Sequence, residues 1–147
     1  MTLKELGLKI CEIANDGNRC KFAACGGSIY SINSLTIKNY PLFFLSPTKT
    51  HTAKKNTTTF HLTGFYIDRM MSDQSNDIDI MSAGVEFLKN LILKIQKIDG
   101  VISVSTDNQC TVYTETEAFN DLCGGCYIEF DVSVRNDTVC ALSLIHI

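Results

Sequence analysis

Hydrophobic residues in the middle of the chain follow two different periods, which predict a strand and then a helix. In the strand Thr57–Asp68, apolar and polar side chains alternate through a β-branched and aromatic stretch, TTTFHLTGFYID. From Ile80 to Ile98 the apolar residues recur every three or four positions, which places them on one helical face. A strand covered by a helix supplies half of a hydrophobic core, so we expect residues 57–98 to organise the rest.

Local signals mark the ends of two predicted helices. Asp77 or Asp79 is expected to cap the long helix, and Gly100 follows its last apolar residue as a C-terminal stop. A shorter helix is predicted between Thr2, a candidate N-cap, and the breaker run at residues 15–18. The apolar residues of this helix at helical spacing are Leu3, Leu6, Ile10 and Ile13.

A hairpin is predicted ahead of the long helix. Leu42–Leu45 has the composition of a short buried strand, and Thr48–Asn56 (TKTHTAKKN) is polar, with three lysines and no acidic residue. So short a connection to the strand at 57–68 requires antiparallel pairing. We predict a protruding loop at Thr48–Asn56, which is either a solvated tip or an arm that reaches an acidic partner, a neighbouring subunit or DNA. Its candidate contact residues are Lys49, His51, Lys54 and Lys55.

The remaining segments predict further strands. Residues 19–39 are expected to be extended or an edge strand, broken at Cys25-Gly26-Gly27. After the long helix we expect a short strand at 101–105, another at 110–117 and a cleanly alternating strand at 126–135, with a bulge or tight bend at the preceding glycines. The predicted fold is α+β: an antiparallel sheet of about four strands with a long hairpin, packed against two helices.

Length and charge narrow the class of protein. A chain of 147 residues, 45% hydrophobic, suits one domain. The formal net charge of −3 disfavours a protein whose main task is gripping nucleic-acid phosphates. No apolar run reaches the ~20 residues that span a bilayer, and the N-terminus lacks the features of a secretory signal. We expect a soluble, intracellular protein.

The last six residues, Leu142–Ile147, are excluded from the predicted fold. Their reverse translation matches the end of a common sequencing-library adapter. We therefore interpret residues 142–147 as an artefact and residues 1–141 as the single native domain.

Seven cysteines allow two interpretations. An odd number cannot all pair within one chain, so reduced thiols that pack as small apolar side chains explain them simply. The alternative is a zinc or redox site. It would be built from the pair Cys123 and Cys126 together with Cys20, Cys25 and Cys110.

The sequence gives little support for a calcium site, a phosphate-binding loop or a catalytic nucleophile. The charged turn with Asp68, Arg69, Asp73, Asp77 and Asp79 lacks the glycine and glutamate of a calcium loop, and capping and solvation explain it. No glycine-rich phosphate loop precedes a helix, and no nucleophile pair is evident. We expect neither an enzyme nor a cofactor.

Four runs of sequence resemble a family of small structural proteins from tailed phages, crAss-like phages included. They are SINSLTIKNYPLFFLSPTKTHT, TFHLTGFYIDRM, SNDIDIMSAGVEFLKNLI and FNDLCGGCYIEFDV, and the resemblance covers residues 28–134. The family includes neck, tail-terminator and tail-completion proteins, which form rings between the portal and the tail.

The resemblance implies a non-enzymatic virion protein of the head-to-tail connector, assembled in the host cytoplasm as a cyclic homo-oligomer. Its partners would be its own copies and other neck, portal or tail proteins, with DNA only as passing cargo and no membrane. Asp68 and Arg69, expected where the hairpin meets the body, would orient the turn or bridge subunits. The other function classes are the cysteine-based zinc or redox protein and a stand-alone binding domain.

Overall fold

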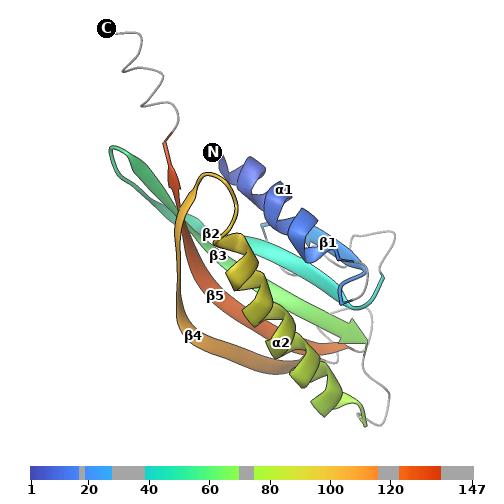
Figure 1. Cartoon of the computed structure of the whole chain (residues 1–147). Helices are drawn as coiled ribbons and strands as arrows, with labels where there is room; N and C mark the ends of the chain where they lie inside the picture. Colours follow the sequence, from blue (N-terminus) through green and yellow to red (C-terminus); the bar gives the residue numbers. More distant parts are fainter. Residues whose placement is uncertain (17–18, 28–38, 70–74, 116–122, 137–147) are drawn as a thin grey trace, which may run out of the picture.

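Two helices cover one face of a five-stranded sheet in a computed structural model that describes residues 1–16, 19–27, 39–69, 75–115 and 123–136. The strands lie in the order β1-β2-β3-β5-β4. In chain order the elements are α1 (Leu3–Ala14), β1 (Phe22–Cys25), β2 (Leu42–Ala53), β3 (Thr57–Arg69), α2 (Asp77–Ile95), β4 (Val101–Glu115) and β5 (Cys123–Arg135). The predicted α+β class is confirmed (Figure 1).

The sheet is mixed rather than purely antiparallel. β1 pairs in parallel with the first four residues of β2, whereas β2–β3, β3–β5 and β5–β4 are antiparallel. The edge strand expected within residues 19–39 is therefore present as β1. Its parallel pairing was not predicted, because such pairing depends on a long connection rather than on a local turn.

The predicted hairpin is present, but its loop is much shorter than predicted. β2 continues to Ala53, with an irregular register between Pro47 and His51, and only residues 54–56 join it to β3. The prediction of a loop over Thr48–Asn56 is wrong because it followed polarity alone. Alternate threonines at 48, 50 and 52 are β-branched, so they suit a strand at the polar edge of a sheet.

The two strands predicted at 101–105 and 110–117 are one strand of 15 residues, β4. Register shifts between Val101 and Ser103, and again between Thr106 and Cys110, accommodate the polar residues that suggested a break. No bend occurs at the glycines of β5, which pair in regular register with Ile67 and Asp68. That prediction is wrong because β3 and β5 pair along their full lengths.

The helix ends agree with the sequence at one position and differ at others. Thr2 caps α1, since its Oγ1 accepts a hydrogen bond from the Glu5 N–H at 3.2 Å. α2 begins after Asn76, whose side chain makes no capping hydrogen bond, so the predicted aspartate cap is wrong. Asp77 Oδ1 instead accepts from the adjacent Ile78 N–H at 2.7 Å. Gly100, with φ of +94°, lies in the turn that leads into β4.

The main core lies between the helices and the sheet. In it the rings of Phe43 and Tyr66 both pack on Phe87 of α2, with centroid separations of 5.9 and 5.4 Å. A smaller cluster lies on the opposite sheet face and consists of Leu42, Phe44, Ile67 and Cys123. Within the described ranges, neither helix is both long and apolar enough to span a membrane.

Candidate functional site

The predicted contact residues lie at two opposite ends of the molecule. Lys54 and Lys55 lie at the β2–β3 hairpin tip, whereas Asp68 and Arg69 end β3. β3 has 13 residues, so about 40 Å of strand separates the two groups. Asp68 and Arg69 therefore lie at the base of the β2–β3 hairpin, opposite its tip, and their role in orienting the turn or bridging subunits stays a prediction. Lys49 belongs to β2, and its side chain falls outside what the structure describes.

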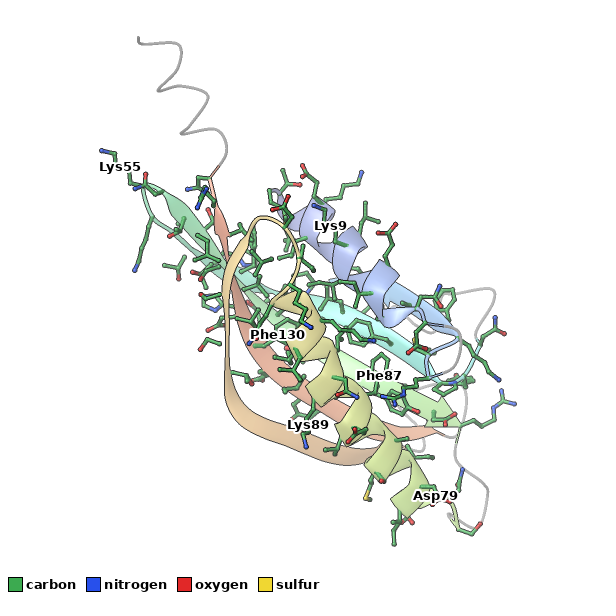
Figure 2. All side chains as sticks on the ribbon, in the orientation of Figure 1. Lys9, Lys55, Asp79, Phe87, Lys89 and Phe130 are labelled. Carbon is green, nitrogen blue, oxygen red and sulfur yellow. The ribbon has the colours of Figure 1, made fainter. Side chains whose placement is uncertain are left out.

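Hydrogen bonds from the end of β5 hold the hairpin tip in place. The Lys54 N–H donates to the Thr57 carbonyl at 2.8 Å and closes the turn. Asn136 binds the tip from the side: its Nδ2 donates to the Lys54 carbonyl and its N–H to the Asn56 carbonyl, both at 2.9 Å. The Thr58 hydroxyl donates to Asn136 Oδ1 at 2.6 Å. The exposed side chains of the tip are thus presented on a fixed backbone, and Figure 2 shows Lys55 at the extremity of the molecule.

A polar row crosses three strands near this end, on the sheet face opposite the helices. His61 of β3 lies between Asp131 of β5, with Nδ1 and Oδ1 2.6 Å apart, and Thr52 of β2, with Nε2 and Oγ1 3.3 Å apart. The His61 and Asp131 side chains are 32% and 44% exposed. The His51 ring lies parallel to the His61 ring at 6.4 Å. The exposed His51 side chain therefore packs with one side against β3 and has the other side in solvent.

The chemistry of this row is that of a cross-strand link. In the neutral ring, Nδ1–H donates to the Asp131 carboxylate and Nε2 accepts from the Thr52 hydroxyl. The order carboxylate, imidazole, hydroxyl is also that of a catalytic triad. Here the hydroxyl belongs to a threonine inside a paired strand, so both ring nitrogens serve to join β2, β3 and β5. The adjoining depression of about 520 Å³ is lined by the side chains of Glu129 and Ser105 as well as by His61 and Asp131.

The sequence predicts His61 only as a strand residue and does not indicate that Asp131 and Thr52 lie beside it. The three residues are far apart in the chain, and only the strand register brings them together. The alternation of β5 did place Asp131 on the polar face. That was the one signal in the sequence that pointed toward it.

At the other end of β3, Asp68 and Arg69 make contacts within the chain. Burial raises the pKa of the half-buried Asp68 carboxyl, and the Arg69 N–H and the charge of Lys21 offset this only in part. Asp68 Oδ1 accepts from the Arg69 N–H at 2.8 Å, and the Arg69 guanidinium lies 5.3 Å from the centre of the Tyr40 ring. Asn76 Nδ2 donates to the Arg69 carbonyl at 3.2 Å, which ties the end of β3 to the start of α2.

The two cysteines of the CGGC motif lie on opposite faces of β5. Residues three apart in a strand point to opposite sides. Cys126 accordingly belongs to the main core, where its Sγ donates to the Met81 carbonyl at 3.5 Å, whereas Cys123 belongs to the smaller cluster. Among the described residues, no three histidine, cysteine or acidic side chains are placed to hold a metal ion. The Cys110 side chain lies outside those residues.

Two further candidate thiols, Cys20 and Cys25, lie near α1 together with Cys11, which was not a candidate, and all three are held in their neutral form. Burial raises the pKa of Cys11 to about 12 and that of Cys20 to about 11, and it also raises the pKa of Cys25. The Cys20 thiol donates to the Phe22 carbonyl at 3.0 Å. A thiol must lose its proton to bind zinc or attack a disulfide, so these environments favour a packing role.

Comparison with protein-family models and with curated protein sequences finds no match for the chain.

Proposed function

We propose that the protein is a non-enzymatic structural subunit of the phage head-to-tail connector, in a neck ring or as a tail-completion or tail-terminator protein. The observation that carries this proposal is the position of two strands at opposite edges of one sheet. β1 covers only Leu42–Leu45 of β2, so the rest of β2 lies at one edge within the described part of the chain. β4 lies at the other edge (Figure 1).

Edge strands favour assembly into a ring. A strand at a sheet edge presents backbone N–H and C=O groups outward and can accept a strand from another chain. The two edges belong to different strands, so a contact of β2 in one copy with β4 in the next joins unlike surfaces. Such a head-to-tail contact repeats from copy to copy and closes into a ring when the rotation permits.

The hairpin tip supports a contact with a different partner. Lys54 and Lys55 are exposed at the extremity of the molecule, on a backbone fixed by Asn136. Because the backbone that carries these two cations is already fixed, the tip loses little backbone entropy on binding, which suits an acidic surface on the next layer of the connector.

The test is to locate the protein in purified virus particles. Quantitative mass spectrometry should find only a few copies of the protein in each particle, as a single ring requires, compared with many copies of the major capsid protein. Deleting its gene should leave filled heads and separate tails in electron micrographs. Complete, infectious particles that lack the protein would contradict the proposal.

A further inference from the structure

An apolar groove of about 850 Å³ runs between α2 and the edge strand β4. Its floor includes buried Ile128 and Ile92, but Leu93 on its wall is 58% exposed. Lys89 and Gln96 are exposed and also line it. The remaining lining side chains are Val85, Val104, Ser105 and Thr106. The groove thus combines apolar surface with a cation.

The first turn of α2 combines an exposed apolar side chain with negative charge. Ile78 is 73% exposed, which is the largest value among the big apolar side chains of the described residues. It lies between two carboxylates, Asp77 and Asp79. Ile78 and Leu93 are fifteen residues apart on one helix, or about 22 Å, so Ile78 cannot enter the groove of its own chain. Figure 2 shows Asp79 at one end of α2 and Lys89 on the side toward β4.

We propose that the first turn of α2 in one copy docks into the α2–β4 groove of the next copy, with Ile78 against Leu93 and Asp79 paired with Lys89. This rests on the proposed ring function and names the surfaces that neighbouring copies would join. The donor and acceptor surfaces differ, so the contact is head-to-tail and can repeat around a ring. It also places the neighbour beside β4, which forms one edge of the sheet in the described part of the chain.

Charge decides which surface of a second copy fits the groove. Leu8 on α1 is also 61% exposed. Its neighbours on the helix surface are Lys4, Glu5 and Glu12, so the Leu8 surface presents charges of both signs to Lys89. The turn around Ile78 carries only the carboxylates Asp77 and Asp79, which favours the Ile78 surface as the occupant.

Exchanging the charges tests the pairing. Asp79→Lys and Lys89→Asp should each weaken self-association at least ~10-fold, as measured by analytical ultracentrifugation, because each places like charges in contact. An equimolar mixture of the two variants should recover it, since every contact then joins opposite charges. Ile78→Ser should also weaken self-association, and mixing it with either charge variant should not restore the association.

Lys97→Asp is the matched control, because Lys97 is exposed and lies outside the groove. It should associate like the unchanged chain, and circular dichroism should show all variants folded. Association that survives both charge variants would overturn this contact and leave the ring proposal standing. An unchanged chain that remains monomeric at high concentration would also overturn the contact. The ring proposal itself is judged separately, by the presence of the protein in virus particles.

Discussion

Gly125 shows how one residue permits the pairing of β3 with β5. A Cβ at this position would overlap the carbonyl oxygen of Tyr66, which is backbone and cannot rotate away. We expect Gly125→Ala to lower the free energy of unfolding by about 3 kcal/mol or more. Urea titration would measure this. Gly27→Ala is the control, since no described atom lies within 4 Å of its Cβ position, and it should change stability by less than ~0.5 kcal/mol.

Asp68 makes stability depend on pH. Burial raises its folded-state pKa above the ordinary value of 3.8, so the folded state holds this proton more tightly than the unfolded state. The resulting stabilisation is present below pH 3.8 and is lost as pH rises through the folded pKa. Asp68→Asn keeps an acceptor for the Arg69 N–H without the buried charge. We expect it to be more stable than the unchanged chain at pH 7, with the difference vanishing in acid.

Denaturant titrations of both proteins between pH 3 and 7 would check this, and exposed Asp99 provides the control as Asp99→Asn. A difference that stays constant with pH, or one that favours aspartate as pH rises, would contradict the assigned cause. The gain should be small, because the Asp68 side chain is only partly buried.

At the scale of elements, the His61–Asp131 link joins strands that the chain brings together from a distance. Both side chains are partly exposed, so a double-mutant cycle with His61→Ala and Asp131→Ala should give a coupling energy of about 0.5–1 kcal/mol. The Thr59–Ser133 hydroxyl pair, 2.8 Å apart one step along the same face, offers a neutral comparison. If the coupling energy of the His61–Asp131 pair is no larger than that of the hydroxyl pair, the carboxylate adds nothing to the link.

The elements that the sequence predicted well are those with an uninterrupted period. α1, α2, β3 and β5 each bury one face, so their apolar residues repeat at 3.6 or 2 positions. β2 and β4 were cut short because their polar residues lie at sheet edges, where polarity does not signal a loop. β1 shows a further limit, since its four residues form a strand only through parallel pairing with β2.

The candidate sites were less predictable than the fold because they depend on which segments meet. The lysines of the tip could be read from TKTHTAKKN, since a polar run between two strands lies at the surface. The distance from that tip to Asp68 follows from the length of the strand predicted at 57–68, but the partner of that strand along its whole length, β5, could not be read from the sequence. The CGGC spacing suggested a joint site, and strand geometry instead sends its two thiols into different clusters.

At the scale of the whole molecule, variants of the hairpin tip distinguish a role in assembly from a role in folding. Lys54 and Lys55 are exposed, so Lys54→Glu with Lys55→Glu should leave the free energy of unfolding within ~0.5 kcal/mol of the unchanged chain. The same change should repel an acidic partner and reduce incorporation into virus particles, measured by mass spectrometry after complementation of a gene deletion.

Lys4→Glu with Lys9→Glu alters the net charge equally on exposed positions of α1 and is the matched control. It should be incorporated normally, since α1 lies away from the tip (Figure 2). Equal loss in both double variants would point to overall charge rather than to the tip. Normal incorporation of both would remove the tip from the contact surface, and the sheet edges would remain as the surfaces through which copies join.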